Sequence, residues 1–217
     1  MLSVGFDKMR GAGLRLLCLG AHSDDIEIGC GGSILKLLSA NEDTDVLWIV
    51  FSAIGERARE ATTTAEWFLS GAKRKSVVIE NFRDSVFPYI GGEIKAYFED
   101  LKQRFSPDLV FTHYRFDLHQ DHRLIAELTW NTFRDHLIFE YEVLKYDGDL
   151  GSPNLFFHLD TATARRKVEY ILKGFESQRD RRWFTADAFA SMMRIRGIES
   201  NAPENFAEGF FCRKIVL

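Results

Sequence analysis

The chain has 217 residues and a formal net charge of −4 at pH 7, with 46% hydrophobic and 28% charged residues. Such a chain is typical of one globular domain with a sizeable core. The acidic balance argues against partners held by positive charge, such as nucleic acid or an anionic membrane. No stretch approaches the roughly 20 apolar residues of a membrane span. Three scattered cysteines, Cys18, Cys30 and Cys212, indicate a reducing compartment, so we expect a cytoplasmic protein.

Apolar runs alternate with amphipathic segments from residue 14 onward. Strands are predicted at residues 14–20, 45–51, 76–79 and 108–112, and helices at 27–40, 56–70, 93–105 and 124–132. A loop is predicted at 82–92, which contains Pro88 and two adjacent glycines. This alternation predicts an α/β fold, a Rossmann-like three-layer sandwich with a mostly parallel sheet.

The pattern is looser beyond residue 137. Strands are predicted at 138–146, 154–159 and 209–216, and helices at 161–175 and 183–196. No repeat or linker divides the chain. We therefore expect a single domain over residues 1–217, with a lead-in at about 1–13 and a part at about 137–217 that shapes the substrate site.

Polar clusters follow the first and fourth predicted strands directly. The first strand runs into His22-Ser-Asp-Asp25, and the segment after the fourth ends in His119-Gln-Asp-His122. Active sites of open parallel sheets lie at the carboxyl ends of their strands. Imidazole and carboxylate ligands suit a divalent metal that keeps open positions for water and substrate. The three-residue spacing within each cluster lets both of its outer residues face the same side.

Structural roles compete with this interpretation for single residues. Asp24 or Asp25 can instead cap the following helix, and Asp121 can be an ordinary helix-start carboxylate. His113 ends the fourth strand, where a structural role is the more common one. Two independent clusters at two strand ends favour a metal site over these alternatives.

The two clusters resemble the signatures of the LmbE-like, or PIG-L, zinc-dependent N-deacetylases. Ala21-His-Ser-Asp-Asp-Ile-Glu27 is similar to the AHPDDE motif, with Ser23 in place of the usual proline and Glu27 displaced by one position. His119-Gln-Asp-His122 is similar to the HxDH motif. The resemblance spans about residues 14–213, and its specificity lies in these two motifs.

The resemblance implies a role for each matching residue. Zn²⁺, or another divalent metal such as Fe²⁺, would be held by three residues: His22, Asp25 and His122. Asp24 would be the general base, and a protonated His119 would stabilise the developing oxyanion. Asp121 would orient a histidine from outside the ligand set.

Three further residues are candidates for binding substrate. Glu56 and Arg59 lie just beyond the second strand, in a region that loosely resembles the family's GE…RxxE segment, and Asp84 lies in the loop after the third. An exposed helix face or surface loop is the alternative for each. The implied reaction hydrolyses the N-acetyl amide of a small-molecule amino-sugar conjugate: an N-acetylglucosamine-type glycoside, a sugar nucleotide or a related conjugate. Family members are often homo-oligomers, so self-association stays an open alternative.

Three other functions are weighed against this one. A dinucleotide-binding protein is disfavoured because Gly29-Cys-Gly-Gly32 is a poor GxGxxG and follows two carboxylates that would repel a pyrophosphate. These glycines are better explained by close packing of a helix on the sheet. A non-catalytic metal-binding protein is disfavoured by Asp24, an apparent base beside the ligands. An iron oxygenase uses similar ligands, but usually in a β-rich barrel.

Overall fold

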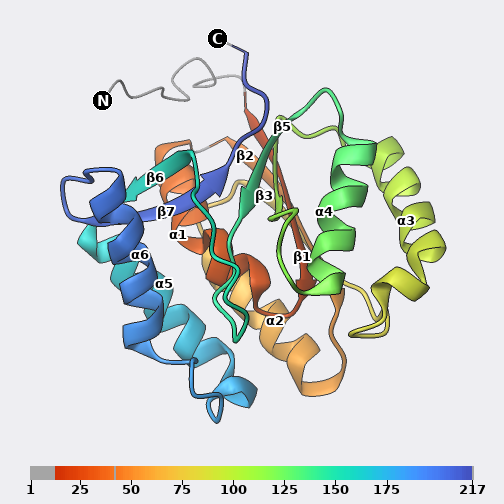
Figure 1. The fold of residues 1–217 in the computed structure, drawn as a ribbon. Helices are drawn as coiled ribbons and strands as arrows, with labels where there is room; N and C mark the ends of the chain where they lie inside the picture. The colour runs from red at the N-terminus through yellow and green to blue at the C-terminus, as the bar shows by residue number, and fades with distance from the viewer. Residues whose placement is uncertain (1–12, 42, 217) are drawn as a thin grey trace.

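Seven strands form one sheet in the computed structural model, which describes residues 13–41 and 43–216 (Figure 1). The predicted lead-in therefore lies, apart from its last residue, outside the described residues. The strands are β1 (Leu14–His22), β2 (Thr44–Ser52), β3 (Arg74–Ile79), β4 (Leu109–His113), β5 (Leu137–Tyr141), β6 (Leu155–Leu159) and β7 (Phe206–Phe211). Their order is β3-β2-β1-β4-β5-β7-β6, with β1 to β5 parallel and β7 antiparallel to both neighbours. The predicted mostly parallel sheet is confirmed.

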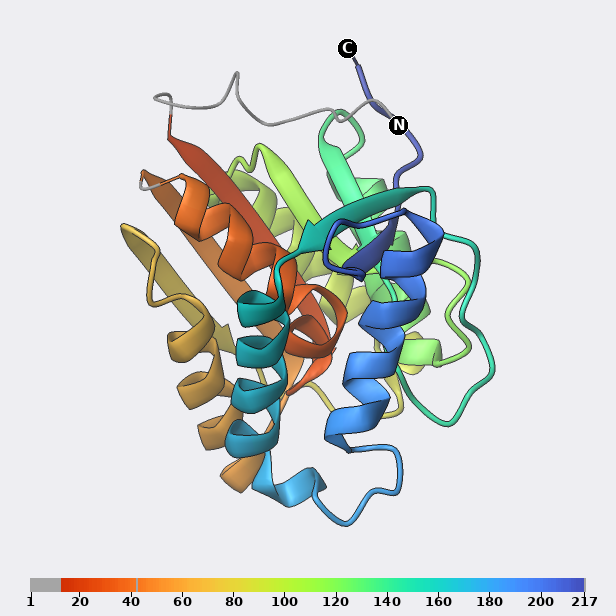
Figure 2. The same ribbon diagram turned by 90° about the vertical axis from the view of Figure 1, so that its left-hand side faces the viewer.

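Helices cover both faces of this sheet. One face carries α1 (Asp25–Ala40), α2 (Gly55–Phe68), α5 (Thr161–Gly174) and α6 (Ala186–Glu199), and Figure 2 shows α1, α5 and α6 in front of the strands. The other face carries α3 (Gly91–Arg104) and α4 (Gln120–Thr132). Short 3₁₀ helices lie at η2 (Phe87–Tyr89) and η3 (Glu176–Gln178). None of the described helices is both long and apolar enough to cross a bilayer.

The central strand β1 is buried on both faces. Leu16 and Cys18 pack in the core under α1, whereas Leu17 and Leu19 pack in the core under α3 and α4. A strand covered on both sides is apolar where both faces are buried, which explains the unbroken apolar run at residues 16–21. Because β1 lies in the middle of the parallel strands, its carboxyl end lies in the middle of their shared edge.

The strand predicted at 138–146 is too long. β5 ends at Tyr141, and residues 142–154 form an irregular connection to β6. Glu142 forms an ion pair with Arg196 on α6, and Lys145 forms one with Asp117, which follows β4. These buried ion pairs direct the chain out of the sheet, although its apolar pattern continues.

The last helix and strand begin at other residues than predicted. α6 starts at Ala186 rather than 183, because the Thr185 side chain caps it by accepting a hydrogen bond from the backbone N–H of Ala188. β7 covers 206–211 rather than 209–216. It ends where the N–H of Cys212 donates to the side chain of Asn154 instead of continuing the sheet.

The glycine-rich turns of α1 allow the helix to pack tightly. A Cβ atom on Gly29 would lie 2.1 Å from the ring of Tyr141, and one on Gly31 would lie 2.5 Å from the ring of Phe68. Real Cβ atoms do not approach other atoms so closely. The glycines therefore serve helix packing, as predicted, which removes the main support for a dinucleotide-binding loop.

A buried ion pair joins the C-terminal elements to α1. Glu208 on β7 lies 2.5 Å from Lys167 Nζ on α5 and also accepts hydrogen bonds from the N–H groups of Gly32 and Ser33. The side chains of Lys167 and Glu208 are 4% and 3% exposed. Their charges are compensated mainly by each other, so the pair depends on both members.

Replacing Glu208 by glutamine should destabilise the fold. The change leaves the Lys167 ammonium buried without its counter-charge, which costs about 3–5 kcal/mol. Urea unfolding should show a lower midpoint at an unchanged m-value. Glu169→Gln, which removes the exposed partner of Lys173 on the same helix, is the matched control and should not move the midpoint. Equal midpoints for both variants would contradict a structural role of the buried pair.

Candidate metal centre

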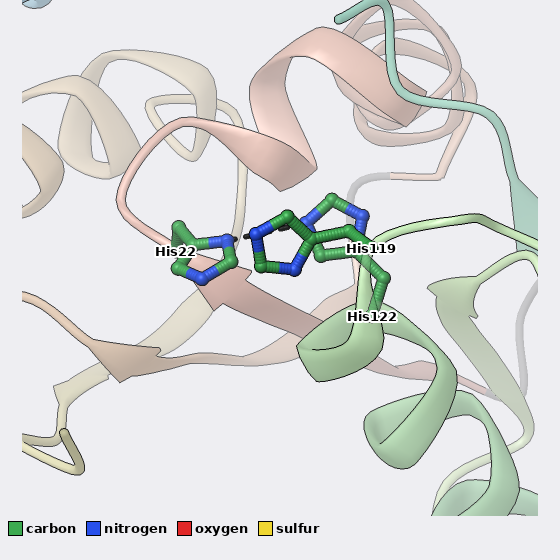
Figure 3. Close-up of side chains that lie close together, drawn as sticks. All are labelled: His22, His119 and His122. Carbon is green, nitrogen blue, oxygen red and sulfur yellow. Dashed lines mark hydrogen bonds between the residues drawn. The ribbon is translucent and has the colours of Figure 1, made fainter. Parts of the chain in front are cut away.

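The two predicted clusters meet at the carboxyl edge of the sheet. His22 is the last residue of β1, and α4 begins beside His119, just after the adjacent parallel strand β4. Figure 3 shows the rings of His22, His119 and His122 gathered together. Their centroids are 4.6–5.2 Å apart. Residues about 100 positions apart in the sequence thus share one site.

Donor atoms of three side chains lie at the spacing of a metal coordination shell. Nδ1 of His22 is 3.1 Å from Nε2 of His122 and 3.3 Å from Oδ2 of Asp25. Oδ1 of Asp25 is 3.4 Å from Nε2 of His122. Ligands bound tetrahedrally to Zn²⁺ at about 2.0–2.1 Å lie about 3.3 Å from one another. All three side chains are buried, so the predicted ligand set fits a divalent metal.

Other donors crowd the same place. Three overlapping groups have ligand atoms within 4.8 Å of one another: His22-His119-His122, Asp25-His113-His122 and His22-Asp84-Asp121. In two of them one nitrogen is already engaged, because Nε2 of His113 accepts from the N–H of Ala21 and Nδ1 of His119 accepts from that of Asp121. The set of His22, Asp25 and His122 uses neither of these two nitrogens, and it stays the predicted ligand set.

Carboxylates outside the ligand set orient both ligand histidines. Nε2 of His22 lies 3.2 Å from Oδ2 of Asp121 and 3.1 Å from Oδ1 of Asp84. Nδ1 of His122 lies 3.0 Å from Oδ2 of Asp117. Each ring can thus donate one N–H to a carboxylate and turn its other nitrogen toward the metal position, the usual arrangement around a protein-bound zinc. Asp121 contacts a histidine in the way that the sequence predicts.

The adjacent aspartates differ in their surroundings. Burial acts to raise the pKa of Asp25, but His122, His113 and His22 outweigh it and hold that pKa well below its usual range. The pKa of Asp24 is raised, mainly by burial and by the neighbouring charge of Asp25. Asp25 is thus suited to binding a cation, and Asp24 to accepting a proton.

The helix-cap alternative finds no support at either aspartate. Asp24 occupies the N-cap position of α1, but its side chain makes no capping hydrogen bond. The carboxylate of Asp25 accepts from the backbone N–H of His22 at 2.6 Å instead. Neither carboxylate is therefore used to cap α1, and both are available to the cluster of histidines.

His119 differs from expectation in its charge. Burial, followed by the charges of His122 and His22, lowers its pKa below the ordinary value of histidine. Because Nδ1 accepts from the N–H of Asp121, the ring proton belongs on Nε2. The structure thus favours a neutral ring with one N–H donor over the expected imidazolium.

Sequence reasoning gave His113 a structural role and did not select Asp117. His113 is fully buried, and its ring stacks on that of His122 with centroids 3.9 Å apart. Burial is the main cause that lowers its pKa to about 4. Asp117 supports His122 and lies two residues before His119, and its place next to the histidine cluster was the available signal.

The candidate substrate residues are only partly brought together. Glu56 and Arg59 are exposed on the first turns of α2, and no contact joins them to the cluster among the described interactions. Arg57, which sequence reasoning missed, donates to Ser23 Oγ at 3.1 Å and approaches Asp24 Oδ1 at 3.5 Å. Ser23 thus supplies an acceptor that the usual proline lacks.

Asp84 and Glu27 differ in exposure. The side chain of Asp84 is 50% exposed and touches His22, so it borders the solvent-facing side. Glu27 is fully buried, and neither of its carboxylate oxygens has a hydrogen-bond partner among the described residues. Burial raises the pKa of Glu27 well above its usual range. The displaced glutamate is therefore a buried acid with no hydrogen-bond partner among the described residues, and Asp24 and Asp25 add to the rise in its pKa.

Comparison with known proteins places these motifs in a family. The family model described as GlcNAc-PI de-N-acetylase, PIG-L, matches residues 17–133. That range contains both histidine clusters, strand β4 and most of strand β1.

Solved structures share the fold over nearly the whole chain. The conserved protein TT1542 from Thermus thermophilus is 20% identical, with a TM-score of 0.73 and 94% of this chain and 96% of that one covered. N,N'-diacetylchitobiose deacetylase from Pyrococcus horikoshii is 19% identical, with a TM-score of 0.67 and coverage of 91% and 83%. GalB, the 4-carboxy-2-hydroxymuconate hydratase from Pseudomonas putida, is 17% identical, with a TM-score of 0.72 and coverage of 94% and 98%. Identities this low establish the fold alone.

Proposed function

Because this chain belongs to the PIG-L family, whose model is described as GlcNAc-PI de-N-acetylase, we propose that it is a metal-dependent N-deacetylase. The proposed substrate is the N-acetyl amide of an amino-sugar conjugate, either an N-acetylglucosamine-type glycoside, a sugar nucleotide or a related compound. One observation carries the proposal: Asp24, with a raised pKa, lies beside a buried donor set of two histidines and one aspartate. The neighbouring structure of N,N'-diacetylchitobiose deacetylase is compatible with this chemistry.

The predicted donor set would hold a metal suited to amide hydrolysis. Its ligands would be His22, Asp25 and His122, with Zn²⁺ as the proposed ion and Fe²⁺ as the alternative. When bound, such an ion lowers the pKa of water and polarises a carbonyl oxygen. Asp117 and Asp121 keep the two histidines in the tautomer that leaves a nitrogen free for it.

The remaining steps belong to Asp24 and His119. Asp24 takes a proton from the attacking water and later returns it to the departing nitrogen. The Nε2–H of His119 donates to the carbonyl oxygen as negative charge develops there. Arg57, close to Asp24, keeps that carboxylate in place. Acetate and a free amine are the products.

Exposed apolar side chains surround this edge of the sheet and support a conjugate as substrate. Among the described residues, six large apolar side chains are exposed on the connections that follow β2, β3, β4 and β5: Ile54, Tyr89, Phe116, Leu118, Tyr146 and Leu150. Apolar side chains gathered at the mouth of a site indicate a ligand that covers them. We therefore propose a substrate whose body extends beyond the sugar, with Glu56, Arg59 and Asp84 as candidate contacts.

The chain's C-terminal part and its cellular setting complete the proposal. We assign residues 137–217 to shaping the substrate site within a single domain, because the connection at 142–154 approaches the metal centre. A cytoplasmic location and a homo-oligomeric state remain predictions.

The test is a paired measurement of metal content and amine release. The purified protein, stripped by a chelator and reloaded with Zn²⁺, should release a free amine from at least one member of a panel of N-acetylated glycosides and sugar nucleotides. The stripped protein should be inactive. If the protein binds zinc but releases no amine from any compound of the panel, the enzyme proposal is refuted and a metal-binding module is favoured. Because a hydratase shares the fold, addition of water to an unsaturated acid is measured in parallel.

A further inference from the structure

We propose that Lys145 is a positioning residue of the metal centre, which acts through Asp117 on His122 and His119. The inference rests on the proposed metal-dependent function. Lys145 lies in the connection between β5 and β6, outside the range 17–133 that the family model matches. The part of the chain that we assign to shaping the substrate site thus also contributes one side chain that contacts the metal centre.

Lys145 is held between two buried carboxylates. Its Nζ atom is 3.0 Å from Oδ2 of Asp117 and 2.5 Å from Oδ2 of Asp149. The side chains of Lys145, Asp117 and Asp149 are 12%, 2% and 5% exposed. Water therefore screens this contact little, and the ammonium is fixed on both sides.

Asp117 passes this constraint on to both histidines of the second motif. Its Oδ1 accepts from the backbone N–H of His119 at 2.7 Å, and its Oδ2 lies 3.0 Å from Nδ1 of His122. One carboxylate thus places a proposed metal ligand and a proposed oxyanion donor. Rotation of the Asp117 side chain would break both of these contacts.

A cation is needed because Asp117 is buried. Nearly all of its surface is shielded from water, and a buried carboxylate without a compensating charge is costly. Burial acts to raise the pKa of Asp117, but the contacts with His122 and the charge of Lys145 hold it well below its usual range. Asp149 secures Lys145 in turn and accepts from the backbone N–H of Leu118 at 2.7 Å.

The expected effect of losing Lys145 is weaker metal binding. Residues that orient a ligand histidine typically contribute about 10–100-fold to metal affinity. Lys145→Met keeps most of the side-chain length and removes the charge. We expect its affinity for Zn²⁺ to fall by about 10–100-fold.

The experiment is a titration of metal-free protein with Zn²⁺ in competition with a chromophoric chelator. Lys173→Met, on the exposed face of α5, is the matched control and should bind like the wild type. Long-range ¹⁵N–¹H spectra of the metal-free protein give a second measurement, in which the ring signals of His122 should shift in Lys145→Met and not in the control. A residue that merely anchors the connection would leave those signals unchanged.

Each outcome has a defined meaning. Unchanged Zn²⁺ affinity in folded Lys145→Met overturns the inference and leaves the proposed function intact, whereas a wild type that binds no Zn²⁺ overturns the proposed function. If circular dichroism shows that Lys145→Met is unfolded, Asp149→Asn decides instead. Its amide oxygen can still accept from Leu118 and from Lys145, because one oxygen of Asp149 serves both, but the negative charge that holds the ammonium is lost. Wild-type Zn²⁺ affinity in Asp149→Asn would then refute the positioning role.

Discussion

Asp24→Asn is expected to lower kcat by about 10²–10⁴-fold, the usual contribution of a positioned general base, while the protein keeps its metal. Asparagine has the shape of aspartate and retains one oxygen toward Arg57, so the loop should not move. It cannot accept a proton. The donor atoms of Asp25 and His122 are untouched, and we expect the Zn²⁺ content to stay stoichiometric.

The measurement pairs kcat with metal analysis of the same preparation. Asp187→Asn, an exposed position on the first turn of α6, is the matched control and should leave both values unchanged. Zinc loss from Asp24→Asn would show that the roles of Asp24 and Asp25 are reversed. A wild-type kcat with full zinc content in Asp24→Asn would show that Asp24 is not the general base.

The centre of the fold and the core of the site were predictable because both depend on local patterns. An unbroken apolar run, as in β1, is required of any strand buried on both faces. The polar residues that end such runs come together because parallel strands share one carboxyl edge. His22 and His122 therefore meet although the sequence separates them by 100 positions.

The groups around the donor set were harder to predict, because one reaches it from the first turn of a helix and another from an irregular connection. Arg57 and Lys145 are ordinary charged residues in the sequence, and only the path of the folded chain brings them to Asp24 and Asp117. Arg59 carries the same charge two positions from Arg57 and faces solvent. No periodicity distinguishes two arginines on the first turns of one helix.

The predicted ends of the strands in the C-terminal part were wrong for a related reason. The apolar sequence pattern of β5 continues beyond Tyr141, where the strand ends. The next residue, Glu142, forms a buried ion pair with Arg196 on α6, away from the sheet. The order β5-β7-β6 places the last strand between two earlier ones. Such pairing is a long-range property, so hydrophobic alternation alone predicts neither the partner nor the end of each strand.

His122→Ala should abolish tight metal binding and, with it, deacetylation. The change removes the Nε2 donor that lies 3.1 Å from Nδ1 of His22 and 3.4 Å from Asp25, so two donors remain of three. A residue that only orients a ligand already contributes about 10–100-fold, and losing the ligand itself should weaken binding by more than about 100-fold. The buried Asp117 also loses one of its hydrogen-bond donors.

Thermal unfolding with and without Zn²⁺ measures this loss independently of activity. At a free Zn²⁺ concentration of about 1,000 times the wild-type Kd, binding stabilises the wild type by about 4 kcal/mol. A variant that binds about 100-fold more weakly gains only about 1.4 kcal/mol under the same conditions, so most of the metal-induced rise in Tm should disappear. His158→Ala, on β6, is the matched control and should keep the full rise. A full rise in His122→Ala would exclude His122 as a ligand and favour a donor set built on His22 and Asp25 with His119 or His113.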